Sequence, residues 1–379
     1  MRIEAIKIRN YRALRAVELE SLTGLSVFVG ANGTGKSTLF DVFGFLQDAL
    51  VYNVRQALAQ RGGFREVVSR GQDGPIEIEL EFREDEEPLV TYSLKIGLAD
   101  GQPVVEREVL QSHRDGQPRR FLDFTRGRGL ALATEAGDDQ PEAEMKLAEQ
   151  QLDAPDILAI KGLGQFQRFR QASAFRRLIE DFHLSDFQPL DAPLSERGDN
   201  LALVAQHLHE RHPKLFQEVL AKMAQRVPGV SRIEAVSTED GRLILRFQDG
   251  SFKDPFLARH VSDGTIKMFS YLLLLHAPKP HPLLCVEEPE SHLYPGLLLE
   301  LAEELREYSE RGGQVLVSSH SPDFLNGMRL DEIFWLVKRD GFTRIHRASD
   351  DPQLVALAAE GDLPGALWKQ GLFQGAHPR

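Results

Sequence analysis

Cysteine is almost absent from the sequence: among 379 residues there is only Cys285, which lies in an apolar run. One thiol cannot close a disulfide within the chain, and it cannot supply the several thiolates of a zinc cluster. A free cysteine is most often a small buried hydrophobe, and we interpret Cys285 in that way. The fold must therefore depend on an ordinary hydrophobic core.

Long apolar runs are also missing. No uninterrupted apolar stretch approaches the ~18 residues that a membrane-spanning helix requires. The opening stretch, MRIEAIKIRN, alternates apolar and charged side chains, which predicts a strand, and it lacks the apolar core of a secretory signal. We expect a cytoplasmic protein that has no membrane partner.

Positive charge is in deficit, because 45 lysines and arginines face 57 acidic residues and the formal net charge is −12. Binding of nucleic acid would need a local basic patch against this background. The segment QFQRFRQASAFRRL interleaves phenylalanines with four arginines: Arg168, Arg170, Arg176 and Arg177. It fits either a surface that tracks a DNA strand or an amphipathic helix with buried phenylalanines and solvated arginines. The segment RDGQPRRFLDFTRGRG leaves the same two alternatives.

The spacing of apolar residues predicts an α/β protein. Period-two patterns in residues 1–20 and 75–111 predict antiparallel strands, and the apolar run LSVFVG predicts a buried central strand. Residues 112–156 have little periodicity and are predicted to form a loop. Residues 165–226 have helical spacing. From residue 264 strands and helices alternate, which indicates a parallel sheet.

These patterns divide the chain into two predicted parts. Residues 1–112 and 228–379 form a discontinuous head, and residues 113–227 form an insertion made of a loop and helices. Within the second part of the head, SRIEAVSTE and RLILRFQ flank an Asp-Gly pair, which predicts a hairpin. We find no internal repeat and no long heptad run.

The stretch GANGTGKST matches the pattern G-x-x-x-x-G-K-[ST] between an apolar strand and a helix, which predicts a phosphate-binding loop. Its glycines let backbone N–H groups point at the phosphates, and the helix start adds its positive end. Lys36 is expected to reach the β and γ phosphates, Ser37 to bind Mg²⁺ and Thr38 to contact the α phosphate. The predicted nucleotide-binding residues of the loop are Gly30, Ala31, Asn32, Gly33, Thr34, Gly35, Lys36, Ser37 and Thr38.

An acidic pair, Glu287 and Glu288, follows the apolar run LLCV. In P-loop folds such a pair ends a buried strand near the phosphate loop. One carboxylate can hold the metal, and the next can polarise the attacking water. Taken alone, the pair also fits a strand end that is capped by solvated charges.

Two more features lie at the ends of predicted elements. His320 ends the apolar strand VLVSS, where it can contact a γ phosphate, although a satisfied structural histidine is the alternative. Ser262, Asp263 and Gly264 begin a predicted helix, with Ser262 as its N-cap. The start of a helix is an anion site, and an ordinary capped helix is the alternative.

The order of these features resembles the ABC-type ATPase heads of SMC, RecF and OLD-family proteins, over nearly the whole chain. IKIRNYRAL is similar to their opening strand and Asn-aromatic-Arg turn, and GANGTGKST is similar to their G-x-N-G-x-G-K-S-T loop. VSDGT resembles the signature sequence of these heads. EEPESHLYP resembles the acidic run of the OLD-like and RecF-like branch, and SSHSP resembles the switch segment of that branch. LSERGDNLALVAQHL also resembles that branch. The fold implied is an AAA-class P-loop NTPase head with an antiparallel β subdomain, a mixed or parallel core sheet and a helical insertion.

The resemblance implies a composite site in a homodimer. Gly30–Thr38 of one subunit would bind ATP, and Ser262–Gly264 of a second subunit would close over the γ phosphate. In isolation Ser262–Gly264 has no chemical task, and delivery in trans gives it one.

The resemblance also implies roles for single residues. Glu287 would hold Mg²⁺ with Ser37, and Glu288 would be the catalytic carboxylate. His320 would be the switch, and Arg12 would contact phosphate or adenine.

The chain departs from the family pattern in several places. Glu287 stands where aspartate is commoner, the signature reads S-D-G-T rather than S-G-G-Q, and we assign no Q-loop glutamine. There is no room for a long coiled coil. The last ~35 residues are too short for the TOPRIM nuclease domain that OLD-family proteins carry.

We therefore predict an ATPase that dimerises on Mg-ATP and controls a separately encoded effector, such as a nuclease, in phage defence or genome maintenance. The alternatives are a RecF-like clamp that binds DNA directly and a non-hydrolysing scaffold, which the presence of Glu288 disfavours. The sequence lacks the N-K-x-D of a GTPase and an arginine-bearing lid of a small-molecule kinase. The run E-P-E-S-H-L fits a transporter ATPase poorly.

Overall fold

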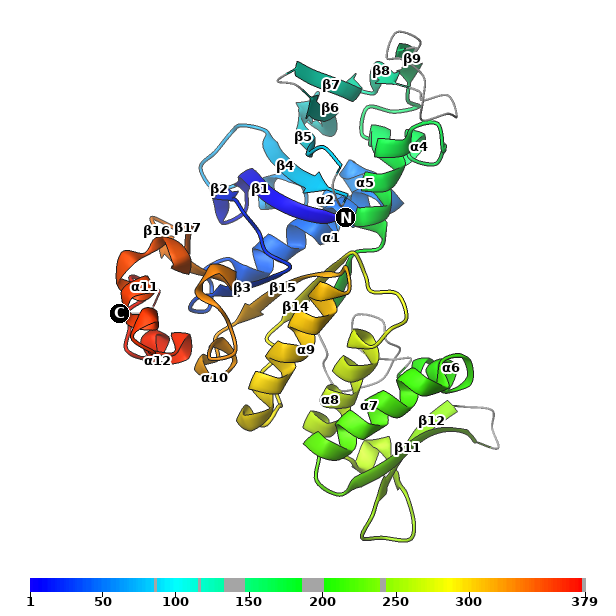
Figure 1. The fold of residues 1–379 in the computed structure, drawn as a ribbon. Helices are drawn as coiled ribbons and strands as arrows, with labels where there is room; N and C mark the ends of the chain where they lie inside the picture. The colour runs from blue at the N-terminus through cyan, green and yellow to red at the C-terminus, as the bar shows by residue number, and fades with distance from the viewer. Residues whose placement is uncertain (85–86, 115–116, 133–146, 186–200, 239–242, 377–379) are drawn as a thin grey trace.

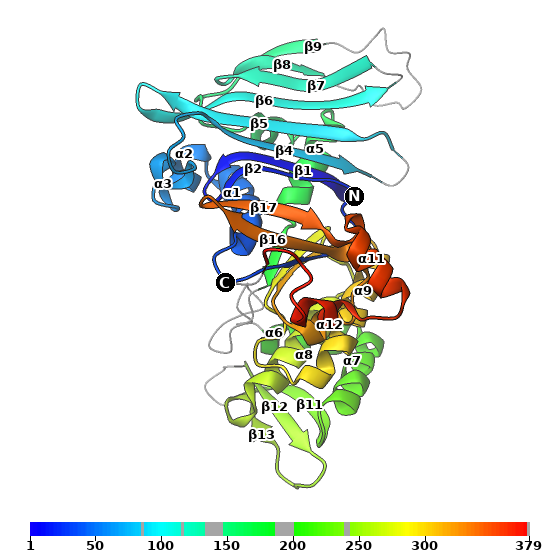
Figure 2. The same ribbon diagram turned by 90° about the vertical axis from the view of Figure 1, so that its left-hand side faces the viewer.

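The computed structural model describes the chain outside residues 85–86, 115–116, 133–146, 186–200, 239–242 and 377–379. Its described strands form three sheets that follow one another along the molecule (Figure 1). An eight-stranded sheet lies at one end, a six-stranded sheet in the middle and a three-stranded sheet at the other end (Figure 2).

The eight-stranded sheet is antiparallel throughout, in the order β2-β1-β4-β5-β6-β7-β8-β9. Its strands are β1 (Arg2–Tyr11), β2 (Leu14–Leu19), β4 (Ile76–Arg83), β5 (Val90–Ala99), β6 (Gln102–Arg114), β7 (Gln117–Thr125), β8 (Arg128–Leu132) and β9 (Leu147–Gln151). The strands that the period-two patterns predict in residues 1–20 and 75–111 are confirmed.

The prediction of a loop over residues 112–156 is wrong, because β7, β8 and β9 extend the sheet there. Leu122 and Phe124 of β7 are buried, whereas Asp123 between them forms ion pairs with Arg107 and Arg120. The charged residues that resemble loop composition therefore alternate with buried ones, as they do on the solvated face of an antiparallel sheet. The division of the chain into head and insertion stays a prediction.

The six-stranded sheet, called the core sheet below, has the order β10-β14-β15-β3-β16-β17. Its strands are β3 (Leu25–Val29), β10 (His183–Ser185), β14 (Leu283–Glu287), β15 (Gln314–Ser319), β16 (Ile333–Arg339) and β17 (Phe342–Arg347). All neighbours are parallel except β17, which pairs antiparallel with β16 at the edge. The predicted parallel sheet and the buried central strand β3 are confirmed.

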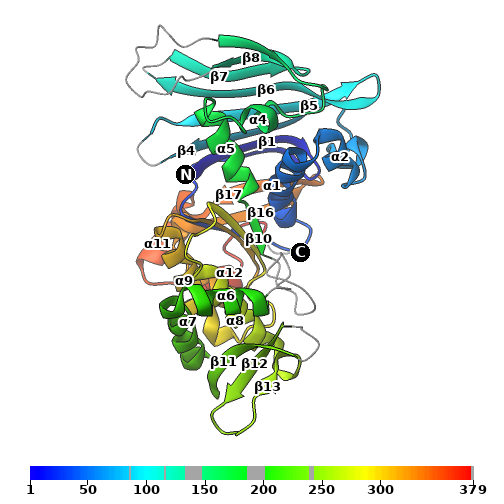
Figure 3. The same cartoon turned by 90° about the vertical axis from the view of Figure 1, so that its right-hand side faces the viewer.

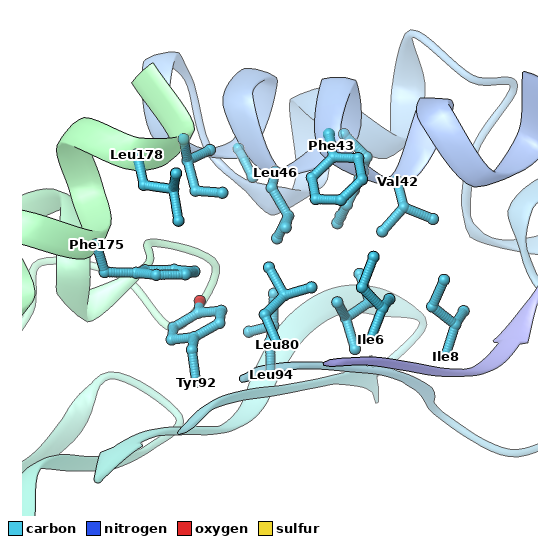
Figure 4. Packing of buried hydrophobic residues seen from close by; sticks show 14 of the residues in the cluster. Ile6, Ile8, Val42, Phe43, Leu46, Leu80, Tyr92, Leu94, Phe175 and Leu178 are labelled. Carbon is cyan, nitrogen blue, oxygen red and sulfur yellow. The ribbon is translucent and has the colours of Figure 1, made fainter. Parts of the chain in front are cut away.

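Helix α1 (Lys36–Val51) lies between the eight-stranded sheet and the core sheet, and its apolar side chains fill the space between them. Figure 4 shows Val42, Phe43 and Leu46 of α1 facing Ile6 and Leu80 of the eight-stranded sheet. On the core-sheet side, Phe28 and Phe40 meet edge to face with ring centroids 6.1 Å apart. This packing fixes the start of α1 relative to the end of β3.

The opposite face of the core sheet is covered by α8 (Asp263–Leu275) and α9 (Leu298–Glu310). Neighbouring residues of β14 point to opposite faces, since Cys285 belongs to the α1 side and Leu284 to the α8 side. Both faces are therefore buried, which explains why the strands of this sheet are continuous apolar runs. Cys285 is buried, as its residue type indicates.

The remaining helices flank these layers. They are α2 (Val54–Ala59), α3 (Phe64–Val67), α4 (Ala159–Leu163), α5 (Arg170–Glu180), α6 (Leu201–Arg211), α7 (Pro213–Arg226), α10 (Pro322–Leu325), α11 (Pro352–Ala359) and α12 (Pro364–Lys369). The three-stranded sheet joins β11 (Val230–Ser237), β12 (Leu243–Asp249) and β13 (Phe256–Leu257), so the predicted pair of strands is confirmed. The Asp-Gly pair expected between them lies outside the described residues.

Helices α4 and α5 lie against the eight-stranded sheet (Figure 3), where Phe175 stacks on Tyr92 with ring centroids 4.2 Å apart. Beneath this stack Glu108 is fully buried. Its carboxylate accepts hydrogen bonds from the Tyr92 hydroxyl at 3.2 Å and from the backbone N–H groups of Ala159 and Ile160. Burial raises the pKa of Glu108 to about 7, although these donors lower it part of the way.

Glu108→Gln is expected to change the pH dependence of stability. Because the folded-state pKa is raised above the ordinary 4.5, the folded state holds the proton more tightly than the unfolded chain does. The stabilisation is present below the unfolded pKa and is lost as the pH rises toward about 7. A shift of this size corresponds to about 3 kcal/mol. Urea unfolding between about pH 5 and about pH 8 should show the wild type losing most of this free energy of unfolding relative to the variant. If the free energies of unfolding of the wild type and the variant changed in parallel with pH, the raised pKa of Glu108 would be contradicted.

Candidate nucleotide site

The predicted phosphate loop connects the end of β3 with the start of α1, as the motif requires. Gly33 and Gly35 have φ values of 78° and 105°, in the left-handed region that favours glycine. A Cβ on Gly35 would also overlap the hydroxyl of Thr343, which donates a hydrogen bond of 2.7 Å to the carbonyl of Thr34. The Thr343 side chain therefore restrains the loop where it meets the first turn of α1.

Lys36 lies folded over this loop. Its Nζ donates hydrogen bonds to the carbonyl oxygens of Gly30 at 2.7 Å and of Ala31 at 3.3 Å. Burial lowers the pKa of Lys36, and the carboxylates of Glu288, Glu290 and Glu287 counter part of this effect. Electrostatically, the acidic residues therefore act on the phosphate loop even before any ligand is bound.

The acidic pair reaches the loop through β15, which lies between β14 and β3. Glu287, at the end of β14, is in register with Ser318 of β15. Glu288 leaves the strand with φ at 42°, and its N–H donates to the carbonyl of Ser318 at 2.9 Å. A non-glycine residue held in this left-handed region stores strain, which is common at functional sites.

The carbonyl of Glu288 is held from the other side. Lys267 of α8 is buried, and its Nζ donates a hydrogen bond of 3.2 Å to the Glu288 carbonyl oxygen. The same ammonium group lies 5.7 Å from the ring centroid of Tyr271. The backbone conformation of Glu288 thus depends on a side chain of the helix that Ser262 caps.

His320 follows β15 and lies beside two carboxylates. Its Nδ1 is 3.5 Å from Oε1 of Glu288 and 3.4 Å from Oε1 of Glu290. The structure therefore brings together three acidic residues, the predicted switch histidine and the phosphate loop. The sequence analysis did not identify Glu290 as a site residue, although the run EEPE contains it and an acid at that place was the available signal.

Ser262 is the N-cap of α8, as predicted, because its hydroxyl accepts a hydrogen bond of 3.2 Å from the N–H of Thr265. Gly264 lies against the segment that follows the acidic pair, and a Cβ there would come within 2.5 Å of the His292 carbonyl oxygen. Among the described residues, no hydrogen bond or ion pair joins Ser262–Gly264 to Gly30–Thr38. Among the described residues, the start of α8 thus approaches the segment after the acidic pair and has no hydrogen bond or ion pair to its own phosphate loop.

Arg12 occupies the turn between β1 and β2 with φ at 48°. Its guanidinium donates to Asp41 of α1 at 2.7 Å, and Asp41 also accepts from the Tyr11 hydroxyl at 2.7 Å and from Arg61 at 2.8 Å. The turn is bound to the edge of the site because the N–H of Thr343 donates to the Ala13 carbonyl at 2.9 Å. Contact between Arg12 and a nucleotide stays a prediction.

A cavity of 1340 Å³ borders the phosphate loop at Ala31, Asn32 and Thr34 and continues along β16 and β17. Neither the acidic pair nor His320 lines it. The side chains of Glu288 and His320 are 43% and 51% exposed, so a further surface is needed to exclude water from them.

Ser37 and Glu287 fit a magnesium ion. Hydroxyl and carboxylate oxygens are ligands that Mg²⁺ prefers, and the ion usually takes only one or two protein ligands besides phosphate oxygens and water. Within the described residues, no three histidine, cysteine or acidic side chains form a metal cluster. The donors therefore suit an ion that arrives with a nucleotide better than one held by protein alone.

The arginines at and just before α5 have local partners. Arg168 lies over the rings of Phe166 and Phe169, and Arg176 forms an ion pair of 2.6 Å with Glu180. Phe169 is buried whereas Phe166 is 53% exposed. The amphipathic-helix interpretation holds for Phe169 and Phe175, which are buried, and is wrong for Phe166, which is exposed and precedes α5, while DNA binding stays a prediction.

The family model described as "AAA domain, putative AbiEii toxin, Type IV TA system" matches residues 25–326. This span contains the phosphate loop, the signature segment, the acidic residues and His320. The chain belongs to this family. P-loop ATPases of this family generally bind ATP together with Mg²⁺.

Two solved structures show the fold. A crystal structure of an Smc head bound to the C-terminal winged-helix domain of ScpA is 14% identical, with a TM-score of 0.57 over 91% of this chain and 97% of that one. An Smc head with an extended coiled coil, bound to the C-terminal domain of ScpA derived from Pyrococcus furiosus, is 13% identical. Its TM-score is 0.54, and the match covers 94% of this chain and 99% of that one. The fold is that of an SMC-type P-loop ATPase head, as the sequence predicts.

A curated relative is the DNA replication and repair protein RecF of Heliobacterium modesticaldum (strain ATCC 51547 / Ice1). It is 28% identical over 133 residues, which are 33% of this chain and 29% of RecF. The similarity thus spans less than a third of that relative's length. Across the described residues, no helix has the length and apolar character to cross a membrane. The cytoplasmic location stays a prediction.

Gly264→Ala is expected to separate the start of α8 from the segment after the acidic pair, because the new Cβ would meet a backbone oxygen that cannot rotate away. Overpacking of this kind costs about 1–3 kcal/mol. Hydrogen exchange should become faster at the amides of residues 265 and 291–293. The control is Gly162→Ala in α4, where the nearest atom would be 3.6 Å away. Equal exchange rates in the wild type and the Gly264 variant would contradict the contact.

Proposed function

We propose that this chain is an ATP-hydrolysing switch that dimerises on Mg-ATP through two composite sites. One observation carries the proposal: the phosphate loop, the acidic residues and His320 lie at the same edge of the core sheet, while among the described residues no hydrogen bond or ion pair joins Ser262–Gly264 of the same chain to the loop. A second copy, related by a two-fold axis, supplies that segment.

The chain's own residues account for ATP binding and cleavage. The N–H groups of the loop and the first turn of α1 bind the phosphates. Lys36 exchanges the carbonyls of Gly30 and Ala31 for the β and γ phosphate oxygens. Ser37 and Glu287 would hold Mg²⁺, which when bound offsets phosphate charge. Thr38 contacts the α phosphate, and Arg12 binds phosphate or adenine.

Glu288 is the proposed general base. A water oxygen attacks the γ phosphorus, the bond from that phosphorus to the bridging oxygen of ADP breaks, and the water proton passes to the Glu288 carboxylate. His320, which lies 3.5 Å from this carboxylate, contacts the γ phosphate and responds to its loss. The start of α8 from the second copy closes over the same phosphate and excludes water.

The product of the cycle is a conformational change rather than a metabolite. Closure of the dimer completes the site, so hydrolysis is slow until the two copies meet. We propose that the closed form controls a separately encoded effector, such as a nuclease, in phage defence or genome maintenance. This last step rests on likeness to the family alone.

The second candidate function is a RecF-like clamp that binds DNA directly. The similarity to RecF and the arginines of α5 favour it. The exposed ring of Phe166, with the Arg168 guanidinium over it, provides the kind of surface on which a strand can stack.

Glu288→Gln is expected to trap the dimer, because the amide cannot accept the proton from water while ATP still binds. Light scattering with Mg-ATP should report twice the monomer mass for the variant, with hydrolysis reduced at least about 100-fold. Glu360→Gln, at an exposed residue outside the site, is the matched control. A Glu288 variant that remains monomeric with ATP would refute the composite site.

Replacement of Arg168, Arg170, Arg176 and Arg177 by glutamine tests the clamp. If these residues bind phosphate groups, DNA affinity should fall and the slope of log affinity against log salt should decrease by about one per lost contact. Lysine at the same four positions keeps the charge and should keep the slope. Unchanged DNA affinity in the glutamine variant would exclude α5 as the DNA surface.

A further inference from the structure

Glu290 has a largely buried side chain that the ATPase mechanism above does not use. Its side chain is 9% exposed, whereas those of Glu288 and His320 are 43% and 51% exposed. Buried carboxylates are uncommon unless they are paired or fully hydrogen-bonded. The contacts of Glu290 therefore need a reason.

One oxygen of Glu290 holds the switch segment. Its Oε1 accepts hydrogen bonds from the hydroxyl of Ser319 at 2.9 Å and from the backbone N–H of His320 at 2.8 Å. The Ser319 hydroxyl in turn accepts from the N–H of Ser321 at 3.1 Å. Three consecutive residues are thus fixed, directly or through Ser319, by one carboxylate.

This anchoring determines where the imidazole ring lies. The backbone of His320 cannot shift without loss of the 2.8 Å hydrogen bond, and its ring stands within 3.5 Å of both Glu288 and Glu290. Glu288 itself is held in a strained conformation. Misplacement of a catalytic group by about 1 Å can lower a rate about 100-fold, so this restraint has a chemical value.

The other oxygen indicates that stability is not the purpose. Oε2 of Glu290 is buried without a hydrogen-bond partner among the described residues. An unsatisfied buried carboxylate oxygen costs free energy, so its presence calls for an explanation other than stability.

We propose that Glu290 is a positioning residue that sets the His320 ring against Glu288, so that the histidine and the catalytic carboxylate act as one unit on the γ phosphate. This inference rests on the proposed ATPase function. It predicts that removal of Glu290 impairs catalysis through His320 far more than nucleotide binding, because among the described residues Glu290 makes no hydrogen bond to the phosphate loop and acts on Lys36 only as one of three carboxylates.

The experiment measures kcat and KM for ATP in Glu290→Ala, Glu290→Gln, His320→Ala and the double variant Glu290→Ala/His320→Ala. Glu290→Ala should lower kcat about 100-fold and change KM for ATP less than about threefold. Glu290→Gln keeps an oxygen that accepts the same two hydrogen bonds, so it should retain kcat within about fivefold. The double variant should be no slower than the slower single variant, because residues that act as a unit are not additive.

Three results would overturn the inference. They are a Glu290→Ala variant with wild-type kcat, losses that multiply in the double variant, and a Glu290→Gln variant as slow as Glu290→Ala. Glu360→Ala, at an exposed residue, is the control for alanine substitution. A thermal melt shows whether each variant folds, and Glu290→Gln keeps the test valid if the alanine variant does not.

Failure of this inference differs from failure of the proposed function. If the wild type hydrolyses ATP and Glu288→Gln abolishes the activity, the ATPase function holds, and only the Glu290 results decide the inference. If the wild type binds Mg-ATP without hydrolysing it, both are refuted.

Discussion

The parallel pairing of β15 with β3 on one side and with β14 on the other is the constraint on which the site depends. Parallel strands end at the same edge of a sheet, so the phosphate loop, the acidic residues and His320 emerge together. The helices on both faces keep these strands buried and leave only their ends accessible. The chemistry of the site is thus a consequence of strand order rather than of any local cluster in the sequence.

Most of the strands and helices could be predicted from sequence because their apolar period is regular. IEIELEF alternates strictly, and the residues of β4 alternate between buried and half-buried in the same way. β7 escaped prediction because its outward-facing side chains, Arg120 and Asp123, are charged and dominate the composition of the segment. In this segment the charged composition predicted a loop, whereas the alternation of residues fits a strand. The burial of Leu122 and Phe124 shows that the strand forms.

The places of the predicted site residues in the fold were predicted more completely than the contacts between them, and their roles stay predictions. A motif gives a residue type and a spacing, and these were sufficient for the phosphate loop, the acidic pair and the cap at Ser262. They do not give the direction of a side chain. The hydrogen bonds of Glu290 to residues 319–320 and of Lys267 to Glu288 join segments that are distant in sequence, and only the packing of β14, β15 and α8 brings them together.

The hydrogen bond from Lys267 to the Glu288 carbonyl has a consequence for how two copies would communicate. In a two-fold dimer of the proposed kind, the start of α8 would contact the nucleotide of the partner, whereas Glu288 would act on the nucleotide of its own subunit. A displacement of α8 in response to the partner's nucleotide would therefore pull on the strained backbone of Glu288. Occupancy of one site would be transmitted to the other in part through the Lys267 side chain, and the two hydrolysis events would be cooperative rather than independent.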